Sequence, residues 1–236
     1  MGDAETYSIQ VYNTSNSTKN YLLFQTVPVA SGTPAVFTNV YQSSGPIQSG
    51  DYSEVQFTMT NEFFAVLGTA PTPLGDHVKV TTGAAIPVTL SSGENPPNEP
   101  GTMGTLSTEG GDGLHPYWEQ VSNTQSNEPN AYGISCDGSF EFPNASNMFV
   151  GMGARDPTTQ QVIPVATLPA EANTDFIFQP IVKYYIGTGT YEAGTVVNIT
   201  EIGPVLTVDF TQSTEKSVVY TQGADNSYKI GPPPDT

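Results

Sequence analysis

Basic residues are scarce in this sequence. It contains 6 Lys and Arg residues against 23 Asp and Glu residues, which gives a formal net charge of −17 at pH 7. Charged residues of both signs make up only 12% of the chain, about half the usual share. The net charge therefore arises from missing bases and not from dense acid. Such a surface repels phosphate backbones and anionic lipids, so we expect no nucleic-acid partner and no membrane partner.

Metal-binding residues are nearly absent as well. Cys136 is the single cysteine, which excludes an internal disulfide and a multi-thiolate zinc site. The two histidines, His77 and His115, are far apart in the sequence and form no paired ligand motif. We therefore expect no metal. Cys136 is followed by Asp137, whose negative charge disfavours a thiolate, so we expect an inert cysteine.

Catalytic and nucleotide-binding motifs are missing too. The sequence has no Gly-x-Ser-x-Gly elbow for a serine nucleophile and no Gly-x-x-x-x-Gly-Lys phosphate loop. The segment Gly187-Thr-Gly-Thr-Tyr-Glu192 begins like a dinucleotide loop but has Glu in place of the third glycine. We therefore expect no cofactor.

Long hydrophobic runs are also absent. No segment approaches the roughly 18 apolar residues of a membrane-spanning helix, and the N-terminus has neither the basic nor the apolar region of a signal peptide. The sequence predicts a soluble protein, either secreted after removal of a signal peptide or cytoplasmic.

What the sequence does contain is many short segments with alternating apolar and polar residues, separated by Gly, Pro, Asn and Ser. No longer segment combines helical periodicity with a capping signal. The sequence predicts an all-β fold with essentially no helix. We expect one domain over residues 1–230, an antiparallel β-sandwich of two sheets, with a closed or partly open β-barrel as the alternative. Residues 231–236, rich in proline, predict an extended tail.

The longest apolar run is Phe176-Ile-Phe-Gln-Pro-Ile-Val-Lys-Tyr-Tyr-Ile186. Read at a period of two residues, both of its faces are largely apolar, as in a strand that is covered on both sides. The run therefore predicts a central strand, with Pro180 marking a bend or bulge.

Residues 91–131 are acidic and rich in Gly, Pro and Asn, which predicts a long loop inserted in the domain. The segment contains His115, Tyr117 and Trp118. These aromatic side chains are candidates for stacking on a sugar ring or another flat ligand. The alternative is that they plug the loop against the sandwich.

Lys183 is the one basic residue inside an apolar run. A buried lysine without a partner loses proton affinity and can act as a base or nucleophile, with Tyr184 and Tyr185 as neighbouring donors. The alternative is a structural lysine paired with a carboxylate such as Asp209 or Glu62.

A weak internal repetition is visible. Phe57, Phe64 and Gly68 have the same mutual spacing as Phe142, Phe149 and Gly153. Either the chain contains a duplication, or sandwich strands resemble one another in composition.

Two functional classes stay open. The first is a non-catalytic binding protein that recognises a carbohydrate or a small apolar or aromatic ligand, through His115, Tyr117 and Trp118. The second is a cofactor-independent cyclase or isomerase that positions a reactive small molecule in an apolar cavity, with Lys183, Tyr184 and Tyr185 as catalytic groups. An aromatic-lined cavity of more than about 300 Å³ favours the enzyme, and a filled core favours the binding protein. A small molecule or glycan is the expected partner, and a homo-oligomer stays open.

Overall fold

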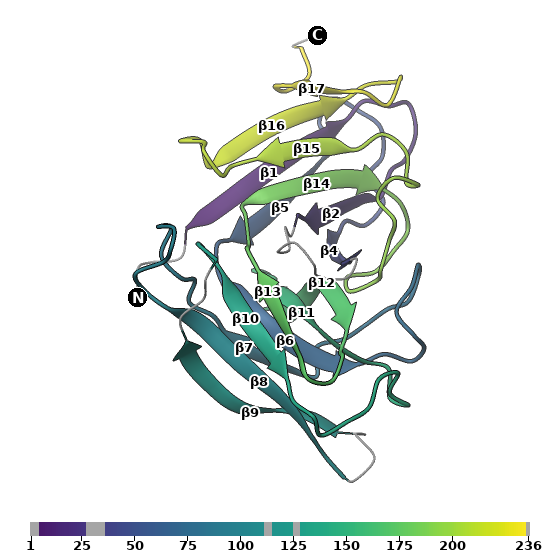
Figure 1. Cartoon of the computed structure of the whole chain (residues 1–236). Helices are drawn as coiled ribbons and strands as arrows, with labels where there is room; N and C mark the ends of the chain where they lie inside the picture. Colours follow the sequence, from purple (N-terminus) through teal and green to yellow (C-terminus); the bar gives the residue numbers. More distant parts are fainter. Residues whose placement is uncertain (1–4, 27–35, 111–114, 125–127, 235–236) are drawn as a thin grey trace.

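The structure, a computed structural model, describes residues 5–26, 36–110, 115–124 and 128–234. Within these residues it contains strands and no helix, which confirms the predicted all-β class (Figure 1). None of the described segments forms a helix with the length and hydrophobicity needed to cross a membrane.

The strands of the first half are β1 (Thr6–Asn13), β2 (Tyr21–Gln25), β3 (Phe37–Thr38), β4 (Val40–Ser43), β5 (Glu54–Thr60), β6 (Phe63–Thr69), β7 (Ala84–Pro87), β8 (Gly101–Glu109) and β9 (His115–Thr124). Those of the second half are β10 (Tyr132–Cys136), β11 (Met148–Arg155), β12 (Val162–Pro169), β13 (Thr174–Phe178), β14 (Lys183–Thr188), β15 (Leu206–Asp209), β16 (Ser217–Gln222) and β17 (Tyr228–Ile230).

These strands form four open sheets where the sequence had predicted two. The strand orders are β17-β16-β1-β5, β15-β14-β2-β4, β9-β8-β10-β13 and β7-β6-β11-β12-β3. Figure 1 shows the first two sheets together at one end of the molecule and the other two at the opposite end. Contacts join the members of each pair: Tyr21 on β2 donates a 2.7 Å hydrogen bond to Gln222 on β16, and the Tyr132 hydroxyl on β10 lies 3.5 Å from the Phe64 carbonyl on β6. The molecule is therefore two stacked sheet pairs.

The four sheets reveal an internal duplication. Replacing each strand of the first half by a counterpart in the second half converts one pair of sheets into the other, apart from the extra short strand β3. The counterparts are β1 and β10, β2 and β11, β4 and β12, β5 and β13, β6 and β14, β7 and β15, β8 and β16, and β9 and β17. Directions agree as well, because β1–β16 and β10–β8 are both parallel pairs.

The register of the pairing supports the same relation. Ile9 faces Phe57 between β1 and β5, and Ile134 faces Phe176 between β10 and β13. At the ends of β6 and β14, Ala70 donates to the Asn147 carbonyl, and Gly189 donates to the Asn20 carbonyl. Counterpart residues therefore make counterpart bonds. We call the two halves repeat 1 and repeat 2, related by a pseudo-twofold axis.

The repeats exchange strands. One sheet pair combines β1, β2, β4 and β5 of repeat 1 with β14 to β17 of repeat 2, and the other combines β10 to β13 with β6 to β9. Each pair thus buries apolar residues from both repeats. The inward side chains Tyr7, Ile9 and Val11 of β1 correspond to Tyr132, Ile134 and Cys136 of β10, and all are buried.

The repetition visible in the sequence is not this duplication. Its Phe and Gly residues at 64 and 68 lie on β6, and those at 149 and 153 lie on β11. These two strands pair directly with each other and are not counterparts. The similarity of counterpart strands is instead best seen in residues 57–69 and 176–188, both of which end in an aliphatic residue followed by Gly-Thr.

The apolar run 176–186 is not one central strand. It forms β13, an outer strand of one sheet, and β14, an inner strand of another, with Pro180 in the break between them. One of its two apolar faces is nevertheless buried as predicted: Phe176, Phe178, Tyr184 and Ile186 have no exposed surface. The apolar pattern is continuous in the sequence because β13 and β14 both bury their even-numbered side chains. The chain nevertheless crosses from one sheet pair to the other between these two strands.

Residues 91–131 are not a long loop either. They contain β8 and β9, which form an antiparallel hairpin with a bulge between Thr105 and Leu106. The Gly and Pro residues that suggested a loop mark the ends of the hairpin and one strand position, Gly104, where the Trp118 ring leaves no room for a side chain.

Candidate functional site

The two groups of predicted site residues lie in different sheet pairs. Lys183, Tyr184 and Tyr185 belong to β14, whereas His115, Tyr117 and Trp118 belong to β9 at the opposite end of the molecule (Figure 1). No single site unites them.

On β14, alternate side chains point to opposite faces. Tyr184 has no exposed surface, and burial raises its pKa; its hydroxyl has no hydrogen-bond partner among the described residues. Lys183 points the other way, with 30% of its side chain exposed and its Nζ 3.9 Å from a carboxylate oxygen of Asp209. Lys183 is therefore a partly exposed ammonium with a carboxylate partner, which is the structural alternative for this residue.

On β9, Trp118 packs against the main core, and its ring lies against Gly104. Its indole nitrogen is buried without a hydrogen-bond partner in the described structure. Tyr117, on the other face, is 38% exposed, and His115 is exposed. Trp118 thus packs against the core, as the alternative of a structural plug requires. Of the three predicted ligand-binding residues, only His115 and Tyr117 have exposed rings.

A cleft that the sequence did not predict lies beside the pseudo-twofold axis. Its walls are residues 79–82, which follow β6, and residues 161–164 at the start of β12, with Ala193 and Gly194 between them. Its volume is about 490 Å³. Val80, Val162, Ile163 and Pro164 provide an apolar wall, and Lys79, Thr81, Thr82 and Gln161 provide polar groups.

The cleft exists because the pseudo-symmetry is broken here. The counterpart segments 70–83 and 189–205 pair with each other across the axis, where Val80 donates to Gly194 and Val196 donates to Val78. Segment 189–205 also bonds to β3 and β4, through Val197 to Thr38 and Thr195 to Val40. In the described structure no backbone bond joins segment 70–83 to β12 in the same way. The space left between them is the cleft, closed at one end where Thr82 Oγ1 donates to the Val162 carbonyl at 2.8 Å.

Two side-chain pairs join the segments that carry Lys79 and Ala193 of the cleft lining. Lys79 forms an ion pair with Glu192, and the hydrogen bond from Lys79 lowers the pKa of the Glu192 carboxyl. Next to it, the His77 ring stacks on Tyr191 with centroids 5.2 Å apart, and His77 Nε2 lies 3.0 Å from the Tyr191 hydroxyl. His77 has a left-handed backbone (φ 67°), a conformation that His adopts more readily than most residues other than Gly, Asn and Asp.

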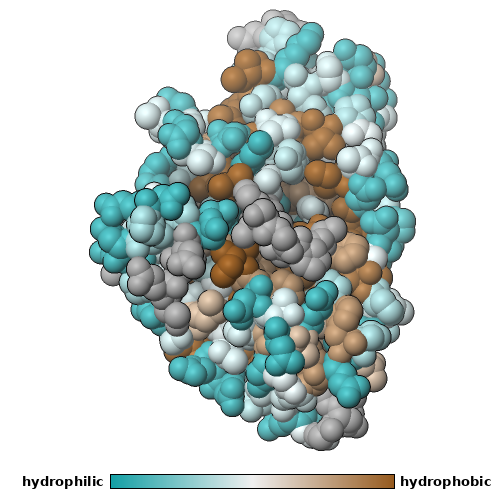
Figure 2. Space-filling model, in the orientation of Figure 1, coloured by the Kyte–Doolittle hydropathy of each residue, from teal (hydrophilic) through white to brown (hydrophobic). Residues whose placement is uncertain are grey.

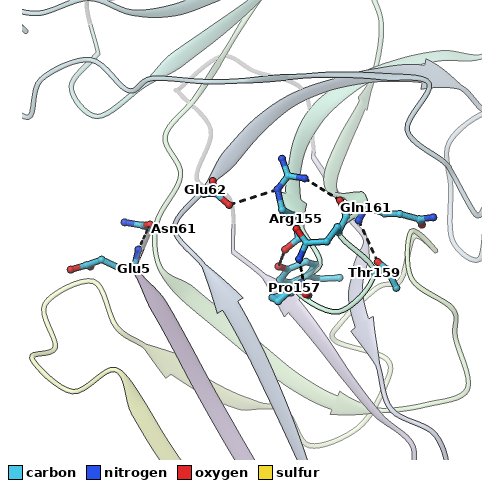
Figure 3. Close-up of polar contacts among 9 residues, drawn as sticks. Glu5, Asn61, Glu62, Arg155, Pro157, Thr159 and Gln161 are labelled. Carbon is cyan, nitrogen blue, oxygen red and sulfur yellow. Dashed lines mark hydrogen bonds and ion pairs between the residues drawn. The ribbon is translucent and has the colours of Figure 1, made fainter. Parts of the chain in front are cut away.

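Arg155, the only arginine, fixes the wall that carries Gln161 (Figure 3). Its guanidinium lies 4.8 Å from the centre of the Phe64 ring and 3.7 Å from Glu62, and it donates a 3.1 Å bond to the Gln160 carbonyl. The turn itself is closed by Asp156, whose backbone N–H donates to Gln161 and whose carboxylate accepts from the next turn residues. Gln161 is therefore held at the cleft by a rigid turn.

The cleft can offer a ligand both hydrogen-bonding groups and an apolar contact surface. A polar rim over an apolar wall suits a small molecule that carries hydroxyl groups on one side and an apolar face on the other. The described residues contain no cluster of three or more His, Cys, Asp or Glu side chains with a geometry suited to a metal ion. The surface seen in Figure 2 agrees with a polar recognition surface, being mostly hydrophilic with scattered hydrophobic areas toward its middle and upper part.

Sequence reasoning missed the cleft for a physical reason. Its lining comes from three segments that are distant in the chain, and its residue types are ordinary for strands and turns. Lys79 is one of the few basic residues, but nothing in the sequence connects it with Glu192, its ion-pair partner in the structure.

The fold and the cleft define a class: an all-β protein of two strand-exchanging repeats with a polar cleft beside their pseudo-twofold axis. The chain belongs to the RhiA family, whose model matches residues 4–232. The match covers both repeats. Searches of curated proteins and of solved structures found no match.

Proposed function

We propose that this protein is a non-catalytic binding protein that holds a small, hydroxyl-bearing ligand, a sugar or short glycan, in the cleft between residues 79–82 and 161–164. The observation that carries the proposal is the cleft itself: it opens where the two repeats meet, and it combines an apolar wall with the Lys79–Glu192 pair and Gln161.

The chemical fit is as follows. One face of a pyranose ring is apolar and packs against Val162, Ile163 and Pro164, while the ring hydroxyls need donors and acceptors at the edge. Gln161 offers both an amide N–H and a carbonyl oxygen, and Thr81 offers a hydroxyl. The Glu192 carboxylate accepts from sugar hydroxyls, and the Lys79 ammonium paired with it donates to them.

The enzymatic alternative finds less support. A cyclase that shapes a reactive substrate needs an enclosed, aromatic-lined cavity. The clefts at β12, at Lys183 and at residues 138–145 have volumes of about 490, 500 and 530 Å³, but all are open and only Phe140 contributes an aromatic ring to their walls. The aromatic side chains fill the core instead, as Tyr21, Tyr41, Tyr132 and Tyr184 have no exposed surface.

A glycan array with the full chain, followed by calorimetric titration of the best glycan, tests this proposal. Gln161→Ala and Lys79→Met should each weaken binding at least tenfold, since each removes a direct hydrogen bond. Lys216→Met is the matched control. Lys216 forms an exposed ion pair with Glu5, with 2.7 Å between Nζ and the carboxylate oxygen, and neither residue lines the cleft. Loss of this pair should leave the affinity unchanged.

Metabolites that copurify with the protein, identified by mass spectrometry, give an independent readout. A bound sugar supports the proposal. No glycan binding, or binding that Gln161→Ala and Lys79→Met leave intact, contradicts it. Conversion of an added metabolite by the purified protein would instead favour the cyclase or isomerase.

A further inference from the structure

We infer a second ligand site, for a single apolar ring, in a pocket at the far end of β12. The pocket has a volume of about 170 Å³. Its lining includes Phe37, Leu74, Phe142 and Met148 together with prolines from three segments. The polar cleft lies at the start of β12 and this pocket at its end, so the two are separate sites.

The size of the pocket suits one ring. Its volume is close to that of the engineered apolar cavity, about 150 Å³, that takes up benzene. Phe142 is 52% exposed at the pocket, although a phenylalanine gains by leaving water. A ligand ring that packs between Phe142 and Leu74 removes this exposed apolar surface from water.

The polar groups of the pocket are already engaged. The Asn144 side-chain oxygen accepts a 2.7 Å bond from the Met148 backbone, and the Asn147 backbone donates to the Asn144 carbonyl. Asn144 therefore holds the turn before β11, and the Asn147 side-chain nitrogen lies 3.5 Å from the Ala70 carbonyl oxygen outside the turn. With these groups engaged and the rest of the lining apolar, the pocket favours an unsubstituted aromatic or alicyclic ring over a sugar.

The duplication gives an independent argument that this place in the fold is a ligand site. By the register of the counterpart strands, Phe37 of repeat 1 corresponds to Pro164 of repeat 2, and Leu74 corresponds to Ala193. Pro164 and Ala193 line the polar cleft, whereas Phe37 and Leu74 line the apolar pocket.

The chemical difference between the two sites has a simple origin. Pro73, at the pocket, is the counterpart of Glu192, the acid that pairs with Lys79 of the cleft. The pseudo-twofold axis thus relates one apolar wall of the two sites. The ion pair beside that wall is present in one copy and replaced by proline in the other.

The test uses the full chain and 4-fluorotoluene, observed by fluorine NMR. Because the pocket is open on one side and the probe is small, we expect saturable binding with a dissociation constant on the order of 1 mM. Phe142→Ser should weaken it at least fivefold. Tyr52→Ser is the control, because Tyr52 is 97% exposed in the connection between β4 and β5. It should leave the affinity unchanged, and so should Gln161→Ala in the polar cleft.

Three outcomes overturn the inference: no saturable binding by the unaltered protein, equal loss in Phe142→Ser and Tyr52→Ser, or loss in Gln161→Ala with retention in Phe142→Ser. The last outcome places the probe in the polar cleft. If near-ultraviolet circular dichroism shows that Phe142→Ser is misfolded, Leu74→Gln replaces it and is held to the same fivefold loss. Because fluorotoluene binding does not depend on the sugar, this result and that of the glycan array are independent.

Discussion

Phe149 on β11 stands directly across from Gly68 on β6, and its ring fills the space that a side chain at residue 68 would need. A Cβ added to Gly68 would lie 2.8 Å from the Phe149 ring and 3.0 Å from the Thr81 carbonyl oxygen. The reciprocal pair, Phe64 across from Gly153, lies on the same two strands. A phenylalanine opposite a glycine thus occurs twice where the repeats meet.

Gly68→Ala should therefore destabilise the protein by about 1–3 kcal/mol, the usual range for overpacking a filled interior. The Phe149 ring can shift, but the backbone oxygen of Thr81 has little freedom. Urea titration measures the change. Gly45→Ala is the control, since a Cβ there meets nothing within 4 Å, and its effect should stay within about 0.5 kcal/mol. Equal stability of the two variants would show that the strands separate easily at Gly68.

Cys136 and Val11 hold counterpart positions on β10 and β1, and both side chains are buried. The repeat itself thus shows that valine fits this position. Cys136→Val should change the free energy of unfolding by less than about 1.5 kcal/mol, as volume-conserving apolar exchanges do. Cys136→Ser should lose about 1–3 kcal/mol, because it buries a hydroxyl in an apolar site.

The thiol should also be unreactive in the folded protein. Burial raises the pKa of Cys136 to about 12, so little thiolate exists at neutral pH. Ellman's reagent should react only at the rate of unfolding. Rapid reaction with the native protein would contradict the burial.

Phe178→Ala tests how firmly β13, the first of the two strands formed by residues 176–186, is attached to its sheet. Although β13 is an outer strand, Phe178 has no exposed surface and stacks on Tyr132 with ring centroids 5.2 Å apart. Phe178→Ala should cost about 3–5 kcal/mol, as truncation of a buried aromatic does. Tyr52→Ala, which removes an exposed ring, should cost little. A loss below about 1 kcal/mol for Phe178→Ala would mean that the outer strand is loosely attached.

The sequence predicted the local features of this fold and missed those that depend on contacts between distant segments. Alternation within segments correctly predicted strands and the buried face of Phe176, Phe178, Tyr184 and Ile186, because alternation is a local property. The assignment of strands to four sheets is not local. Residues 57–69 and 176–188 each cross between sheet pairs with only a bend, and nothing in their composition marks the crossing. The cleft was out of reach for the same reason, since Lys79, Gln161 and Gly194 meet only after the repeats have exchanged strands.

Buried tyrosines should make the protein sensitive to alkali. Burial raises the pKa of Tyr7 to about 12, and it also raises the pKa of Tyr132 and Tyr184. In the unfolded chain these phenols titrate near 10. The folded state therefore binds more protons above pH 10, and stability falls as the pH rises through that value toward 12. Absorbance at 295 nm should show these buried tyrosines ionising only as the protein unfolds.

Tyr184→Phe separates a structural from a catalytic tyrosine. The Tyr184 hydroxyl has no hydrogen-bond partner in the described part of the chain, so its removal should leave stability unchanged or raise it. Part of the alkaline sensitivity should disappear with it. A loss of more than about 1 kcal/mol would show that the hydroxyl has a partner, such as a buried water.

Lys183→Met addresses a second catalytic candidate, because methionine keeps most of the stem and removes the amine. The Lys183–Asp209 pair is partly exposed and 3.9 Å long, so its loss should cost no more than about 1 kcal/mol. Asp209 keeps its other partner: hydrogen bonds from Thr211 are the main reason why its pKa is lowered, ahead of the charge of Lys183. The double variant with Asp209→Asn should accordingly show little coupling in urea titration. Ligand binding in the β12 cleft should be unaffected, since Lys183 lines a different cleft. If Lys183→Met instead folds normally but abolishes conversion of a metabolite that the unaltered protein turns over, the amine is catalytic and the protein is an enzyme.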